Sequence, residues 1–254
     1  MRLPDSLLDA IRFLTIVRVR NTESAMAPDW LARAMKYFPV VGAGIGLVSA
    51  LVLLIANEFV SPVIAALLAV TAGIILTSAL HEDGLADTAD AFGGGWTIEK
   101  RLAIMKDSRI GSYGALALGL GVALRVAAIS DMPMWAGPAA LIAAHAAARA
   151  APAFVMNRLR YAGNTAAMKV SYAEAPVRSG ELRFALVVVL LAMLPLALIS
   201  LSTVLVGLLC GAALAFVLTR WSRHMLGGYT GDVLGAVEQV FEIGFLLGVV
   251  AALS

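Results

Sequence analysis

The sequence predicts an all-α membrane protein with about seven transmembrane helices. Of its 254 residues, 61% are hydrophobic and only 14% are charged, and the mean hydropathy is +0.89. Soluble domains are closer to half apolar and a quarter charged, so this deficit of charge indicates that membrane lipid surrounds the chain. The net charge of +2 gives no indication of nucleic acid as a partner.

Apolar runs recur along the chain at lengths that suit a bilayer, because a spanning helix needs about 20 apolar residues. The run from Phe184 to Leu218 is too long for one helix, and we place its turn at the serines 200–202 rather than at Pro195. Glu238 and Glu242 interrupt the last run. The predicted spans are 37–56, 61–80, 113–130, 134–156, 184–200, 202–219 and 234–253.

Basic residues lie on one side of the predicted membrane. Segments 1–36, 81–112, 157–183 and 220–233 hold six, four, five and two of the 19 Lys and Arg residues, and the turns on the other side hold none. Basic loops stay in the cytoplasm, so these segments are expected to face it. We expect one membrane domain over 1–254, with an amphipathic, interfacial helix in segment 1–36.

The most informative stretch runs from His81 to Asp90 and reads HEDGLADTAD. Asp83, Asp87 and Asp90 lie at positions i, i+4 and i+7, so on a helix they share one face. Carboxylates this close repel one another, and a divalent cation would remove the conflict. Oxygen ligands suit Mg²⁺. We therefore expect segment 81–112 to hold the active site with Mg²⁺ as cofactor; a solvated acidic turn is the alternative.

A sharp reversal is predicted after this helix. Gly93–Gly95 end it, and Thr97 can cap the next helix. The reversal would return Asp107 toward the three aspartates as a fourth catalytic ligand. Lys106 and Arg109 flank Asp107 and would bind substrate phosphate, with a salt bridge inside the loop as the alternative. Acids for metal beside bases for phosphate suit phosphoryl transfer.

Three further residues are candidates for substrate contacts. Arg149 lies in a predicted span, where a charge needs a partner or a ligand. It would hold a phosphate or pair with Glu238 or Glu242. Arg160, at the membrane edge, would contact substrate or only orient the protein. Asp232 would contact substrate or cap a helix.

These motifs resemble a known family. The stretch from His81 to Asp90, followed by IMKDSRIG at 104–111, is similar to the cobalamin synthase family, the adenosylcobinamide-GDP ribazoletransferases. The resemblance extends to stretches at 13–15, 37–42, 160–162 and 226–232. It therefore covers nearly the whole chain.

The resemblance implies the last assembly step of vitamin B12. It implies that the chain joins α-ribazole, or its 5′-phosphate, to adenosylcobinamide-GDP, giving adenosylcobalamin, or its phosphate, and GMP. It also implies Mg²⁺ dependence, a location in the bacterial inner membrane, and catalytic aspartates at Asp83, Asp87 and Asp90. The ligand role of Asp107 is an inference from its position alone.

Two other functions are compatible with parts of the sequence. A CDP-alcohol phosphotransferase would need the motif Asp-Gly-x-x-Ala-Arg, and here Asp87-Thr88 replaces its last two residues. A transporter would place charged groups near the bilayer midplane, whereas most acids here gather at the cytoplasmic rim. The oligomeric state stays open, a homo-oligomer included. The charged or titratable residues that favour a transporter are Arg125, His145, Arg149, Glu238 and Glu242.

Overall fold

The computed structural model describes residues 3–20, 29–163 and 177–254, and most of these residues are helical. Within these ranges, six helices are long and apolar enough to cross a membrane, and a bent pair of helices adds a seventh span if the pair is counted as one. The prediction of an all-α protein with about seven spans is thus confirmed.

The helix boundaries agree with the predicted spans to within a few residues at most ends. The turn after the fifth span lies at Ser200, as predicted, and Pro195 stays inside a helix. The elements are α1 (Asp5–Leu14), α2 (Trp30–Ala34), η2 (Met35–Tyr37), α3 (Phe38–Asn57), α4 (Pro62–Thr77), α5 (Leu80–Gly94), α6 (Ile98–Ile104), α7 (Ser112–Asp131), α8 (Gly137–Met156), α9 (Ser179–Ile199), α10 (Leu201–Leu226) and α11 (Gly231–Leu253).

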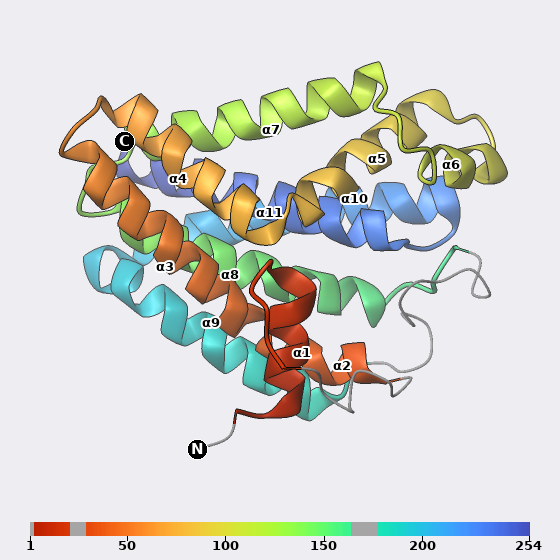
Figure 1. Ribbon diagram of the computed structural model, residues 1–254, viewed down its shortest axis with the longest axis horizontal. Helices are drawn as coiled ribbons and strands as arrows, with labels where there is room; N and C mark the ends of the chain where they lie inside the picture. The colour runs from red at the N-terminus through yellow and green to blue at the C-terminus, as the bar shows by residue number, and fades with distance from the viewer. Residues whose placement is uncertain (1–2, 21–28, 164–176) are drawn as a thin grey trace.

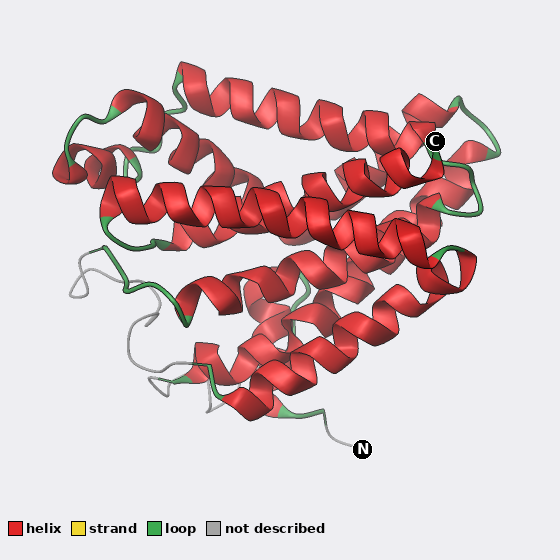
Figure 2. Ribbon diagram, turned by 180° about the vertical axis from the view of Figure 1, so that it is seen from behind, coloured by secondary structure: helices red, strands yellow, loops and turns green. Residues whose placement is uncertain are grey.

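Two central helices organise the bundle. Helices α8 and α11 are largely buried, whereas α7, α9 and α10 expose most of their residues. Helix α7 lies along one side and α9 along the opposite side, with α11 and α8 between them (Figures 1 and 2). The central pair is therefore where charged side chains can be shielded from lipid.

Glycine allows α3 to approach α8 closely. A Cβ atom at Gly46 would lie 2.7 Å from the carbonyl oxygen of Leu141, which is closer than any side chain tolerates. Such small-residue contacts are typical of helix packing in membranes. The contact fixes the position of α8, which carries His145 and Arg149.

Helices α4 and α5 form a broken span. They meet at an angle of 90°, because Ser78 and Ala79 adopt left-handed conformations with φ of 53° and 56°. This conformation costs about 1–2 kcal/mol for each non-glycine residue. The predicted span 61–80 therefore ends early, at Thr77. The bend turns α5, which carries the acidic motif, away from the direction of α4 (Figure 1).

The N-terminal segment forms α1 and packs on the start of α3. Leu8 and Leu14 are buried, and Leu14 joins an apolar cluster with residues of α2, η2 and α3. Arg12 remains partly exposed. The location of α1 at the membrane surface stays a prediction.

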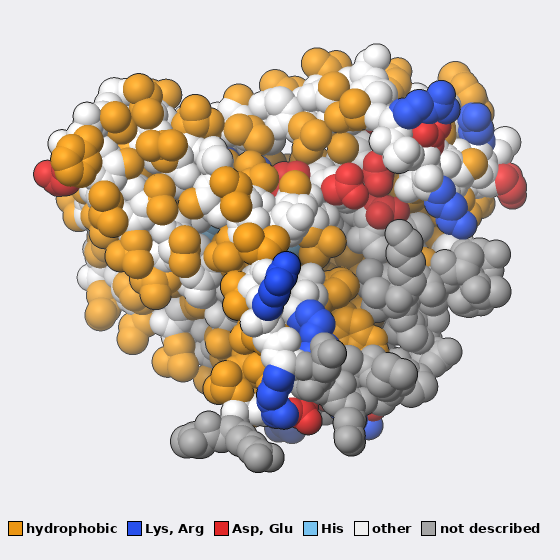
Figure 3. Space-filling model, viewed as in Figure 1, with side chains coloured by type: hydrophobic (Ala, Val, Ile, Leu, Met, Phe, Trp, Pro, Cys, Tyr) orange, Lys and Arg blue, Asp and Glu red, His pale blue; other side chains and the backbone are white. Residues whose placement is uncertain are grey.

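Charged side chains are distributed unevenly over the surface. In the view of Figure 3, hydrophobic side chains cover the half of the face where α3 and α4 lie. Acidic and basic side chains gather toward α5 and α6, and further basic side chains lie over α1. This separation is typical of a protein with its apolar half in lipid and its charged end in water.

Candidate active site

Three carboxylates form an acidic group where α5 meets α11: Asp83, Asp87 and Asp232. Asp83 and Asp232 are among the charges that act on Asp87, and Asp83 also acts on Asp232. Asp83 is exposed and the other two are half-buried. No hydrogen bond or ion pair joins the carboxylate of Asp83 or of Asp87 to another described residue. The group thus offers free carboxylate oxygens to solvent.

A close helix crossing brings these acids together. A Cβ atom at Gly84 would lie 2.7 Å from the carbonyl oxygen of Asp232, and one at Gly235 would lie 3.5 Å from the Cα atom of Gly84. The two glycines therefore let α5 and α11 cross in contact, with Asp83 beside Asp232. Thr230, rather than Asp232, caps α11, since its hydroxyl accepts from the Val233 amide at 3.3 Å.

Asp90 lies on the same helix but binds the backbone of α7. Its Oδ2 accepts a hydrogen bond from the Gly111 amide at 2.7 Å, and its Oδ1 accepts one from the Gly114 amide at 2.8 Å. It thus satisfies amides at the helix N-terminus, which also favours a negative charge. Glycine is needed at both positions, because a Cβ atom at either would meet the Asp90 carboxylate. Its role as a metal ligand stays a prediction.

Asp90→Ala is expected to lower the free energy of unfolding by about 1–3 kcal/mol, because it leaves amides without acceptors. Unfolding in mixed detergent micelles measures this change. Asp131→Ala is the matched control, because Asp131 is an exposed acid at the other end of α7. An Asp90→Ala protein with unchanged stability would contradict the capping role.

The predicted reversal after α5 is present. Helix α5 ends at Gly94, and the Thr97 hydroxyl caps α6 by accepting from the Lys100 amide at 3.2 Å. The Arg101 guanidinium donates to the Met225 carbonyl at 2.7 Å and so fixes α6 against α10. The glycine turn and the helix cap are therefore confirmed.

The reversal leaves Asp107 paired with a base rather than with the acidic group. Arg109 donates Nε to Oδ1 of Asp107 at 3.0 Å and Nη2 to Oδ2 at 2.6 Å. These hydrogen bonds lower the pKa of Asp107 to about 2, and Lys100 is a further charge acting on it. Lys106 is exposed nearby. The salt bridge inside the loop, the alternative for Arg109, is the arrangement observed.

Arg160 lies beside the loop that leads to Asp232. The Tyr229 amide donates to the Arg160 carbonyl at 3.0 Å, which ties this loop to the end of α8. Arg160 lines a cavity of about 470 Å³ together with Arg158 and Arg223. These bases can therefore meet an anionic substrate beside the loop that leads to Asp232.

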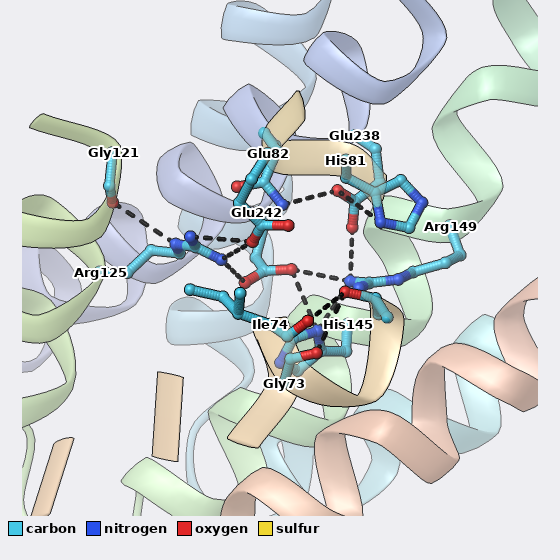
Figure 4. Close-up of polar contacts among 12 residues, drawn as sticks. Gly73, Ile74, His81, Glu82, Gly121, Arg125, His145, Arg149, Glu238 and Glu242 are labelled. Atoms are coloured by element: carbon cyan, nitrogen blue, oxygen red, sulfur yellow. Dashed lines mark hydrogen bonds and ion pairs between the residues drawn. The ribbon is translucent and has the colours of Figure 1, made fainter. Parts of the chain in front are cut away.

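A buried ion network lies inside the bundle, between α5, α7, α8 and α11 (Figure 4). Each member is less than a tenth exposed. Because unpaired charge is costly in lipid, such residues have to satisfy one another. The network consists of His81, Glu82, Arg125, His145, Arg149, Glu238 and Glu242.

Two arginines hold the network together. Arg125 pairs with Glu82 of α5 at 3.1 Å and with Glu242 of α11 at 3.3 Å. Arg149 pairs with Glu242 at 2.7 Å and with Glu238. The predicted pairing of Arg149 with Glu238 or Glu242 is thus present, while its contact with phosphate stays a prediction. The roles of His81 and Glu82 were missed, because their partners, Glu238 of α11 and Arg125 of α7, lie on helices distant in sequence.

A cavity of about 130 Å³ lies between the acidic group and the buried ion network. Asp83 and Asp232 line it, as do His81, Arg149 and Glu238. A larger cavity of about 910 Å³ lies between α8, α9, α10 and α11, and its described lining residues include three arginines but no acid. Chemistry that needs carboxylates therefore belongs to the smaller cavity.

The acidic group suits Mg²⁺ shared with a substrate rather than a complete protein site. Within the described ranges, no three His, Cys, Asp or Glu side chains form a ready metal site. In phosphoryl transfer, however, Mg²⁺ is usually held by one or two carboxylates, substrate phosphates and water. Asp83, Asp87 and Asp232 meet this smaller requirement.

Comparison with known protein sequences agrees with these features. Residues 6–250 match the sequence model of the Cobalamin-5-phosphate synthase family. Three relatives, each named adenosylcobinamide-GDP ribazoletransferase, are from Azorhizobium caulinodans, Bradyrhizobium diazoefficiens and Leptothrix cholodnii. They are 44%, 42% and 40% identical, over 94% of this chain and 93%, 90% and 92% of their own lengths. No solved structure matches the chain.

Proposed function

The chain belongs to the cobalamin-5-phosphate synthase family, and we propose that it transfers a cobinamide phosphate from adenosylcobinamide-GDP to α-ribazole or its 5′-phosphate. The observation that carries this proposal is the acidic group at a small cavity that Arg149 also lines, with the basic cavity of Arg160 beside the loop that leads to Asp232. Carboxylates and arginines in this arrangement suit a reaction between a hydroxyl group and a diphosphate.

The chemistry is a phosphoryl transfer. A ribose hydroxyl of the acceptor attacks the phosphorus atom attached to cobinamide, and the bond from that phosphorus to the GMP oxygen breaks. The hydroxyl proton is released, and a carboxylate of the acidic group can accept it. The products are adenosylcobalamin, or its 5′-phosphate, and GMP.

Different residues of this chain would bind the metal and the substrate phosphates. Asp83, Asp87 and Asp232 would hold Mg²⁺, which supplies positive charge to the diphosphate when bound. Arg160 and its neighbours Arg158 and Arg223 line a basic cavity and would bind phosphate oxygens. A transporter is disfavoured, because the charged residues inside the bundle pair with one another.

Release of GMP tests the proposal. Purified protein in detergent receives adenosylcobinamide-GDP, α-ribazole and Mg²⁺, and we expect GMP only when both substrates are present. A chelator should abolish the release. No GMP with either α-ribazole or its 5′-phosphate would overturn the proposed function, and GMP without an acceptor would indicate a hydrolase instead.

The active site is proposed to face the cytoplasm at the bacterial inner membrane, because the basic segments lie at the same end as the acidic group. Glu99 and Glu58 are exposed at opposite ends of the bundle and can each be replaced by Cys in a Cys210→Ala protein. An impermeant maleimide applied to spheroplasts should label Glu58→Cys at once and Glu99→Cys only after lysis. The reverse pattern would contradict this orientation.

A further inference from the structure

The small cavity of about 130 Å³ has both apolar and charged side chains in its wall. Most of its apolar residues come from the segment of α1 to α3 and from α8, with Leu80 of α5 and Leu234 of α11, so α1 and α2 contribute to the wall of the candidate active site. The mouth of the cavity carries Asp83 and Asp232 of the acidic group. The wall consists mainly of Phe13, Leu14, Leu31, Met35, Phe38 and Met156.

Buried polar side chains line the inner end of this cavity. His81 is 6% exposed and Arg149 is 3% exposed. Nδ1 of His81 and Nε of Arg149 have no hydrogen-bond partner among the described residues, and the nearest carboxylate oxygen paired with His81, Oε2 of Glu238, is 3.8 Å away. Buried polar groups are almost always satisfied, so these unpartnered atoms beside a cavity are available to bond a ligand that enters it.

We propose that this cavity binds the heteroaromatic base of the acceptor nucleoside and holds its ribose at the mouth, beside Asp83 and Asp232. This inference rests on the proposed function. The base of α-ribazole is a flat benzimidazole with two methyl groups and one free ring nitrogen. Its rings and methyl groups suit the apolar wall, and its nitrogen can accept a hydrogen bond from Arg149 or His81.

The chemistry of the cavity favours this base over the guanine of the other substrate. Guanine has donors and acceptors along most of its edge, and burying them against apolar side chains is costly. The aromatic and aliphatic side chains offer them no partners, because the polar side chains of the lining are Asp83 and Asp232 at the mouth and His81, Arg149 and Glu238. The cavity is also too small for a corrin ring, so the larger substrate has to approach from outside the mouth.

The experiment fills the cavity. Leu31→Phe narrows it, whereas Leu208→Phe makes the same change in the larger cavity as a matched control. We expect Leu31→Phe to raise the KM for α-ribazole by about tenfold or more, which is typical when a pocket loses a good fit. The KM for adenosylcobinamide-GDP should stay within about twofold. Unchanged KM for α-ribazole would overturn the inference.

Direct binding separates this inference from the proposed function. Equilibrium dialysis with free 5,6-dimethylbenzimidazole should show saturable binding that Leu31→Phe weakens, Leu208→Phe leaves intact and guanine does not displace. Saturable binding of the base without GMP release would contradict the proposed transferase function and still support binding of the base in this cavity. GMP release together with base binding that Leu31→Phe does not weaken would support the transferase function but contradict the proposed location of the base.

A second variant covers the case in which Leu31→Phe fails to fold. Met35→Ala enlarges the same wall instead of filling it. We expect it to improve use of a nucleoside with a bulkier base, such as a naphthimidazole riboside, relative to α-ribazole. An unchanged preference between these two acceptors would contradict the proposed subsite.

Discussion

Asp83→Asn and Asp87→Asn are each expected to lower kcat by about a hundredfold or more, because each removes a charge that helps hold Mg²⁺ against the transferring phosphoryl group. Neither carboxylate has a hydrogen bond or ion pair with another described residue, so these charges serve no evident packing role. The dependence of GMP release on Mg²⁺ concentration measures the effect, and the apparent affinity for Mg²⁺ should fall with the rate.

Stability should not fall in these two variants. The substitutions keep side-chain size and relieve repulsion between like charges, so thermal stability without Mg²⁺ should be equal or higher. Asp131→Asn, which changes an exposed acid at the far end of α7, should keep full activity. The proposed metal role would be contradicted if the Asn variants of Asp83 and Asp87 kept the full rate and the same Mg²⁺ dependence, or if they failed to fold.

Asp107→Asn distinguishes two versions of the site. The structure pairs Asp107 with Arg109 in an exposed loop, so this change should leave Mg²⁺ dependence nearly unaltered. The pKa of about 2 keeps Asp107 ionised and paired throughout the usual assay range. A loss as large as that of Asp83→Asn would instead mean that the loop moves during catalysis and brings Asp107 to the metal.

Local signals explain why much of the architecture could be predicted. Each signal lies within one segment of the chain: the long apolar runs, the serines at 200–202 and the turn at Gly93–Gly95. The structure confirms the spans, the break and the turn that they predict. The motif spacing also placed Asp83 and Asp87 correctly on one helical face. Such features depend on helix periodicity and chain conformation, which can be read directly from sequence.

Contacts between distant segments could not be read in this way. The bend at Ser78 and Ala79 contains neither glycine nor proline, so no local signal marks it. The carboxylate of Asp90 reaches an amide 21 positions later, and only the packing of α5 against α7 determines that contact. Spacing alone therefore did not distinguish Asp90 as a helix cap from the two aspartates with free oxygens.

Arg149→Met is expected to lower the free energy of unfolding by about 3–5 kcal/mol, the usual cost of removing one partner from a buried ion pair. Arg149 pairs with both Glu238 and Glu242 inside the bundle, and the variant leaves these carboxylates short of positive charge in a medium that solvates charge poorly. Unfolding in mixed micelles measures the loss. Arg158→Met, an exposed arginine just after the same helix, should change stability by less than about 0.5 kcal/mol.

Two companion variants separate an ion-pair role from a substrate contact. Adding Glu238→Met to Arg149→Met removes both charges, so the double variant should be more stable than the sum of the two single effects predicts. Arg149→Lys keeps the charge but loses the planar guanidinium. If the ion pairs are its main role, Arg149→Lys lowers stability and leaves the KM for adenosylcobinamide-GDP unchanged. A raised KM at full stability would show instead that Arg149 contacts a substrate phosphate, and the network would then be part of the binding site rather than the frame that holds α5 in place.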